Sequence, residues 1–162
     1  MPKTKRKGAP TGKIKSGMAS PRIYISNLHK RGRIRPRKLS RLAGRILRSE
    51  KKIGEMDIIL ADDRLLKSLN TRFAGKRKTT DVLSFPLSER LKENSGRNYW
   101  GEIYISLNQA KRQAKTYGIS LQVEVLKLVC HGTLHLLGYD HIKTKDASKM
   151  QAKERKYLNE NQ

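Results

Sequence analysis

The chain has 162 residues, of which 37 are Lys or Arg and 14 are Asp or Glu, so its formal net charge is +23. This length predicts one domain of ordinary size, and the charge favours a polyanion as partner, nucleic acid before an anionic membrane surface. The sequence lacks the roughly 18 consecutive apolar residues of a membrane-spanning helix. Cys130 is its single cysteine, so a disulfide scaffold is not indicated. We therefore expect a cytoplasmic protein with no membrane partner.

The basic side chains are concentrated near the N-terminus. Residues 1–20 mix Lys, Gly, Pro and Ser with almost no large apolar side chains, and the first acidic residue of the chain is Glu50. Such a segment buries too little apolar surface to offset the entropy of ordering it. We therefore predict a disordered basic arm over residues 1–20 and a single domain over residues 21–162.

The first half of the domain alternates strand and helix patterns. Residues 22–28 alternate apolar and polar side chains, as a strand with one buried face does. Pro36 is well placed to open an amphipathic helix with a basic outer face. Residues 56–61 predict a buried strand, and Asp62 or Asp63 can cap a second helix. The first helix is expected to bury Leu39, Leu42, Ala43, Ile46 and Leu47.

A basic loop precedes the third predicted strand. Lys76, Arg77 and Lys78 follow Gly75 and lead into a short apolar run that Pro86 ends. We take these three cations as candidate contacts for the phosphate backbone of a nucleic acid.

The second half of the chain predicts one more strand and three helices. Polar residues 87–99 predict a loop, after which residues 101–107 alternate as a strand. A helix follows, and Ser120 can cap the next one, which is apolar nearly all round, as expected of a central buried helix, and ends at Gly138. Residues 144–158 have the composition of a last helix.

Three of the four histidines lie within the eleven-residue segment HGTLHLLGYDH. His131 and His135 are four residues apart on a predicted helix, so their imidazoles project side by side. Gly138 can adopt a left-handed conformation that ends the helix and lets the chain return His141 as a third ligand. Three imidazoles with an open fourth position are typical of catalytic zinc, although nickel, copper or iron would accept the set. We predict that these three histidines bind one Zn²⁺.

The spacing of these histidines is that of the metzincin proteases, whose helix carries a Glu directly after the first His. Gly132 occupies that position here and has no side chain to accept a proton, so peptide hydrolysis by that mechanism is not expected. Asp140 is the nearest carboxylate and our candidate catalytic residue. It could accept a proton, orient a ligand imidazole or cap the turn, and the sequence leaves these three roles open.

The segment from His131 to His141 is similar to the signature H-G-x-L-H-L-x-G-Y-D-H of the YbeY-type rRNA maturation factors, a family of metal-dependent endoribonucleases. The resemblance extends through TDVLSFP at residues 80–86 and the Gly-acid-Ile start at residues 101–103, and it covers about residues 22–158. It implies an α+β fold, in which a small mixed sheet of about four strands packs with helices, one of them a zincin-like metal-binding helix. It also implies zinc held by the three histidines.

The resemblance further implies a zinc-dependent endoribonuclease that serves small-subunit rRNA maturation and ribosome quality control, and we expect it to act on single strands. Its partners would be ribosomal RNA and the small ribosomal subunit, with ribosomal proteins or a GTPase as further candidates. The chain departs from the family at Ala74, where an arginine thought to serve the RNA-cleaving site is usual. Lys76, Arg77 or Lys78 could supply a cation from the same loop.

Two other functions are consistent with parts of the pattern. Ala74 and the lack of an assigned base favour a non-catalytic ribosome assembly factor with a structural or vestigial metal site. The zincin-like spacing favours a metallohydrolase of a peptide or a small phosphoester, which Gly132 opposes.

Overall fold

The computed structural model describes residues 20–29, 32–88 and 98–160. The sheet has four strands in the order β1-β2-β4-β3. Strands β1, β2 and β4 are parallel, and β3 pairs antiparallel with β4 at one edge. The predicted α+β class with a small mixed sheet is confirmed. The strands are β1 (Arg22–Asn27), β2 (Glu55–Ala61), β3 (Val82–Pro86) and β4 (Tyr99–Ser106).

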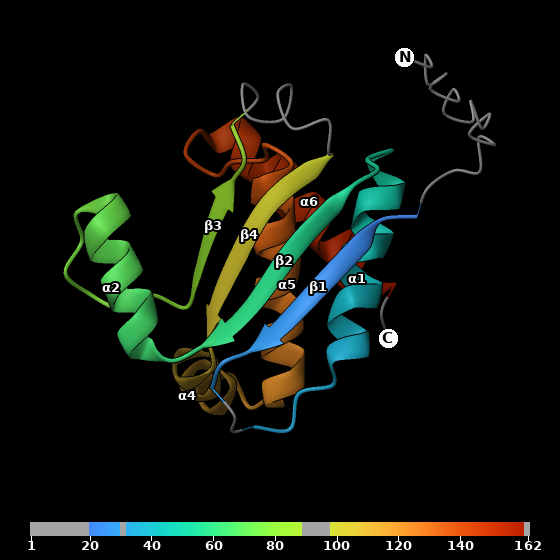
Figure 1. The fold of residues 1–162 in the computed structure, drawn as a ribbon. Helices are drawn as coiled ribbons and strands as arrows, with labels where there is room; N and C mark the ends of the chain where they lie inside the picture. The colour runs from blue at the N-terminus through green and yellow to red at the C-terminus, as the bar shows by residue number, and fades with distance from the viewer. Residues whose placement is uncertain (1–19, 30–31, 89–97, 161–162) are drawn as a thin grey trace, which may run out of the picture.

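The described residues form five helices. Figure 1 shows α5 and α1 running behind the sheet, α2 beside β3, and α4 below the lower end of the sheet. The last helix, α6, packs against α5 on the side away from the strands. None of the helices in the described ranges is long and apolar enough to span a membrane. The helices are α1 (Pro36–Ser49), α2 (Asp63–Ala74), α4 (Leu107–Tyr117), α5 (Leu121–Leu136) and α6 (Thr144–Asn159).

Local sequence signals account for most helix ends and for the buried face of α1. The side chain of Asp62 accepts a hydrogen bond from the amide of Leu65, and that of Ser120 accepts one from Val123, so both predicted caps are present. The apolar positions predicted for the core side of α1 are all wholly buried; they are Leu39, Leu42, Ala43, Ile46 and Leu47.

The helix α5 is the central buried element, as its nearly uniform apolar sequence predicts. It ends at Leu136, and Gly138 has a φ of 91°, which glycine adopts at little cost. Cys130 lies wholly within the core, and burial raises the pKa of its thiol to about 12. The HGTLHLLGYDH segment therefore begins on a helix that is fixed by packing on several sides.

The predicted boundary of β4 was wrong by two residues. The strand begins at Tyr99 rather than Gly101, because Tyr99 pairs with Glu55 across a register irregularity in β2 and its hydroxyl donates to Asp57 Oδ2 at 2.5 Å. That pairing depends on a strand more than 40 residues earlier in the chain and leaves no local pattern. Most of the predicted 87–99 loop and of the basic arm over residues 1–20 lies outside the described residues.

Candidate metal centre

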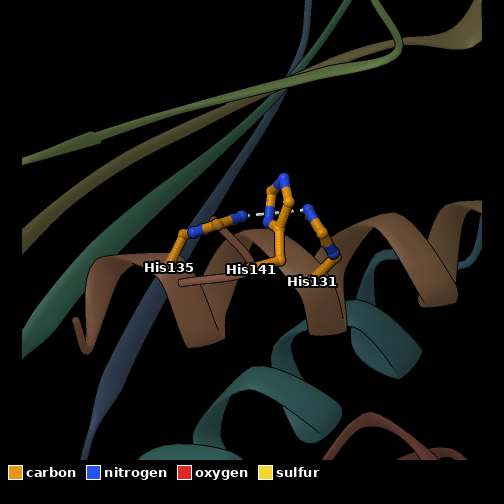
Figure 2. Close-up of side chains that lie close together, drawn as sticks. All are labelled: His131, His135 and His141. Atoms are coloured by element: carbon orange, nitrogen blue, oxygen red, sulfur yellow. Dashed lines mark hydrogen bonds between the residues drawn. The ribbon is translucent and has the colours of Figure 1, made fainter. Parts of the chain in front are cut away.

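The three histidines of the HGTLHLLGYDH segment converge on one point. His131 and His135 project from the last two turns of α5, and His141 comes from the segment between α5 and α6 (Figure 2). Their ring centroids are 4.6 to 5.6 Å apart, and one nitrogen of each ring lies within 4.8 Å of the others. The geometry that the spacing predicts is therefore present.

The last helix orients the first of these rings. The Nδ1 of His131 lies 2.7 Å from Oε1 of Glu154, which projects from α6. An ionised carboxylate only accepts, so Nδ1 is the donor in this contact, and in a neutral ring Nε2 then keeps its lone pair. A carboxylate in this position fixes the tautomer and the direction of a ligating imidazole.

The chain just after α5 orients the second ring. The Nδ1 of His135 donates to the backbone carbonyl of Tyr139 at 2.9 Å. A carbonyl cannot donate, so His135 likewise presents Nε2 as an acceptor. Burial lowers the pKa of His135, and the neighbouring His131 lowers it further, which favours the neutral form that coordinates metals.

These tautomers provide a test of whether the residues fit a metal ion. The Nε2 atoms of His131 and His135 lie 3.0 Å apart, along the dashed line in Figure 2. If both rings are neutral in these tautomers, the two Nε2 lone pairs face each other, and a proton or a metal cation between them is needed to make the contact favourable. Tetrahedral zinc with Zn–N distances of roughly 2.0–2.1 Å would separate two such nitrogens by about 3.3 Å. The donor set fits a zinc-like ion.

A partly buried carboxylate supports the turn that carries the Tyr139 carbonyl. Glu50, at the C-terminal end of α1, accepts hydrogen bonds from the hydroxyl of Tyr139 at 2.8 Å, from Nζ of Lys153 at 2.7 Å and from the hydroxyl of Tyr157. Burial alone would raise its pKa, but these hydrogen bonds outweigh burial and leave the pKa of Glu50 lowered. Helix α6 thus supports both helix histidines, one directly and one through Glu50.

The position of Gly132 explains why no glutamate follows the first histidine. A Cβ atom there would lie 2.8 Å from Cγ2 of Ile103 and 3.1 Å from Oγ of Ser84, because α5 packs closely on the sheet. The hydroxyl of Ser84 also donates to the carbonyl of Gly132 at 3.3 Å. A longer side chain therefore has no room, and the metzincin base has no counterpart at this position.

A cavity of about 470 Å³ opens beside the histidines, between them and β3. Its walls include the carboxylate residue Asp81, which the sequence reasoning did not select although it lies within TDVLSFP. Asp81 accepts hydrogen bonds from the Gln113 side chain at 2.9 Å and from the Val82 amide at 2.8 Å. Its position next to the three rings makes it a second candidate for handling protons or orienting water.

The predicted catalytic carboxylate has a structural contact. Asp140 accepts a hydrogen bond at 2.7 Å from the backbone amide of the next residue, His141. Among the described residues, the lining of the histidine cavity includes Asp81 and not Asp140. The catalytic role of Asp140 stays a prediction.

The predicted RNA-binding cations lie in an exposed loop between α2 and β3. The side chain of Asn70 donates to the carbonyl of Lys78 at 2.8 Å and so holds the loop, which also carries Lys76 and Arg77. This loop leads directly into the residues that line the histidine cavity, although its three cations are not among the described lining residues. Ala74 is the exposed last residue of α2.

Comparison with known proteins assigns this arrangement to a family. A model of the family described as Endoribonuclease YbeY matches residues 24–162. The chain is 45% identical over 106 residues to an endoribonuclease YbeY of Myxococcus xanthus, in a match that spans 65% of this chain but only 36% of that relative. A relative of the same name from Desulforamulus reducens is 46% identical over 103 residues, which span 62% of this chain and 67% of that protein.

A solved structure agrees with this assignment. The solution structure of a Thermotoga maritima protein superposes with a TM-score of 0.60 at 31% sequence identity, covering 86% of this chain and 88% of that one. The family model matches the region that holds nearly all of the sheet, α5 and the three histidines. The chain therefore belongs to the endoribonuclease YbeY family, whose named members are hydrolases that act on RNA.

Proposed function

We propose that this protein is a zinc-dependent endoribonuclease that acts on single-stranded regions of ribosomal RNA, in the cytoplasm, during small-subunit maturation and ribosome quality control. The observation that carries the proposal is the pair of helix imidazoles whose Nδ1 atoms are both engaged as donors. Their Nε2 lone pairs, together with His141, point at a common position that a cation would fill. Membership of a family of named endoribonucleases supports RNA as the substrate.

Different residues would hold the metal ion and bind the RNA. His131, His135 and His141 would hold the ion, and a bound zinc ion supplies Lewis-acid chemistry that polarises a phosphoryl oxygen and lowers the pKa of water. The exposed loop with Lys76 and Arg77 would attract the RNA backbone, and the net charge of +23 would do so at longer range.

Metal analysis combined with RNA cleavage tests the proposal. Purified protein should retain about one zinc ion per chain and cleave a single-stranded rRNA fragment, and His135→Ala should lose both properties. His29→Ala is the matched control, because this fourth histidine lies outside the cluster and contacts Asn108. Unchanged cleavage by metal-free His135→Ala protein would refute the mechanism.

A ribosome assembly factor without catalysis is the second candidate function. Two observations favour it: Ala74 supplies no cation at the end of α2, and the carboxylate of Asp140 is engaged with the backbone of His141. This alternative predicts tight, salt-sensitive binding of ribosomal RNA or the small subunit by zinc-loaded protein, with no turnover after rigorous purification. Cleavage that is abolished by a chelator and by His135→Ala would exclude it.

A further inference from the structure

A second cavity, of about 830 Å³, adjoins the histidine cavity, because Pro86 and His135 line both. Its other walls include Tyr99 and Trp100 at the start of β4, and Lys52 in the turn between α1 and β2. A volume of this size is typical of small-ligand sites. The cavity is therefore adjacent to the histidine cavity and bordered by aromatic rings and a cation.

The cation and one of the rings form a recognisable pair. Nζ of Lys52 lies over the indole of Trp100, 5.3 Å from the ring centroid. The indole nitrogen donates to the carbonyl of Ile53 at 3.2 Å, which fixes the ring relative to the turn. Lys52 is exposed, and no carboxylate of the described residues lies within 4 Å of its ammonium group, so it is available to an anionic ligand.

We propose that this cavity is a nucleotide subsite, in which one base of a single-stranded RNA displaces the Lys52 ammonium from the ring of Trp100 and stacks there, while Lys52 contacts the adjoining phosphate. The inference rests on the proposed function for the identity of the ligand. Base stacking on an aromatic ring is tolerant of sequence, and an unpaired strand offers its base faces, whereas a duplex does not. A strand crossing His135 would place a neighbouring phosphate beside the three histidines.

The polar lining suits the rest of a nucleotide. Asn98 and Ser88 border the cavity and offer an amide and a hydroxyl to base edges or sugar oxygens, and the chain at Gly138 offers backbone groups close to His135. A ligand held by stacking and by one cation should depend less on salt than one held by charges alone, since only charge neutralisation releases counterions. A weak salt dependence of binding would therefore distinguish the subsite from the general basic surface.

Intrinsic fluorescence reports on the subsite directly, because Trp100 is the only tryptophan of the chain. The probe is a single-stranded 2′-O-methyl oligonucleotide, titrated into the full chain in the presence of a chelator so that no turnover occurs. We expect saturable quenching of Trp100 by this strand and none by heparin, a polyanion without bases. Equal quenching by heparin, or no quenching by the bound oligonucleotide, would overturn the subsite.

Variants provide a second readout that does not depend on the tryptophan signal. Lys52→Ala should weaken binding of a dye-labelled strand about fivefold, and Trp100→Leu about tenfold, as the loss of a cation contact and of one stacked base predicts. Lys111→Ala, which removes an exposed cation from α4 at the other end of the sheet, is the matched control. Lys52 is exposed, so its variant should fold even if Trp100→Leu does not.

Two outcomes separate this inference from the proposed nuclease activity. The subsite would be refuted, and the activity left intact, if the protein cleaves RNA with zinc but the oligonucleotide does not quench Trp100 and Lys52→Ala binds the labelled strand with wild-type affinity. Saturable quenching by the 2′-O-methyl strand, together with no cleavage of the unmodified RNA of the same sequence by zinc-loaded protein, would support the subsite and refute the activity.

Discussion

The C-terminal end of α5 and the segment that follows it contribute to the same site in different ways. His131 and His135 project from a buried helix, and each has its Nδ1 atom held, by Glu154 and by the Tyr139 carbonyl respectively. His141 is exposed, and its ring makes no hydrogen bond to any described residue. The helix therefore presents two ligands already oriented, while the third depends on the backbone of its turn.

The largest predicted effect tests this difference by removing one ligand from each region. Binding free energies of about 10–16 kcal/mol for four-ligand structural zinc imply roughly 3 kcal/mol for each ligand, or about 200-fold in affinity. His131→Ala should lose at least this much, and His141→Ala clearly less, because an ordered ligand loses less entropy on binding. Competition with a chromophoric chelator measures both affinities, and equal losses would contradict the distinction.

The next effect concerns the carboxylate that holds the first ligand. Glu154→Ala should weaken zinc binding about 10- to 100-fold, because the ring of His131 loses the partner that fixes its tautomer and direction. Glu154→Gln retains an acceptor oxygen and should recover part of the loss. Gln151→Ala, an exposed change on the same helix, is the control and should leave the affinity unchanged. A wild-type affinity in Glu154→Ala would show that the helix histidines need no external orientation.

The same two regions show what the sequence could predict. The spacing of His131, His135 and His141 was sufficient to predict their convergence, because helix periodicity and a glycine at its end are local properties. The supporting residues could not be found in this way. Glu154 lies 23 residues and Glu50 89 residues from the groups they contact, so only the packing of α6 and α1 against α5 brings them there.

The fold shows the same division between local and distant information. Strands, caps and the buried face of α1 follow from local patterns, whereas the start of β4 at Tyr99 depends on its pairing with Glu55. The close approach of Gly132 to Ile103 likewise depends on two separate elements. The sequence showed that a metzincin glutamate is absent from position 132 but not that the sheet leaves no room for one.

A third prediction tests whether the rigid end of α5 depends on its contact with the sheet. Gly132→Ala should destabilise the protein by about 1–3 kcal/mol, because the new Cβ would lie 2.8 Å from Ile103 in a closely packed core. Gly44→Ala is a matched change in α1, where the new Cβ meets no atom closer than 3.5 Å. That variant should gain about 0.5–1 kcal/mol from helix propensity. Chemical denaturation measures both, and shifts of the same sign would contradict the packing account.

The smallest predicted effect is a pH dependence that comes from Glu50, which supports the turn between the two regions. Its pKa in the folded protein is lowered from the ordinary value of 4.5, because the hydrogen bonds from Lys153, Tyr157 and Tyr139 outweigh the effect of burial. A carboxyl group with a lowered pKa contributes its full stability above pH 4.5, and this contribution is lost as the pH falls through the folded-state pKa. Glu50→Gln should therefore cost about 1 kcal/mol near pH 7.

The difference between Glu50→Gln and wild type should shrink below pH 4.5, where protonation gives the wild-type protein the same neutral side chain. Denaturant titrations of metal-free protein from pH 7 to pH 3 would follow this convergence, with Glu160→Gln as the control. Glu160 lies at the exposed end of α6 and is 4.0 Å from Arg45, so its variant should parallel wild type throughout. No gap between Glu50→Gln and wild type at pH 7 would mean that Glu50 acts through its shape and not its charge. The Tyr139 carbonyl, and with it His135, would then be held by packing alone.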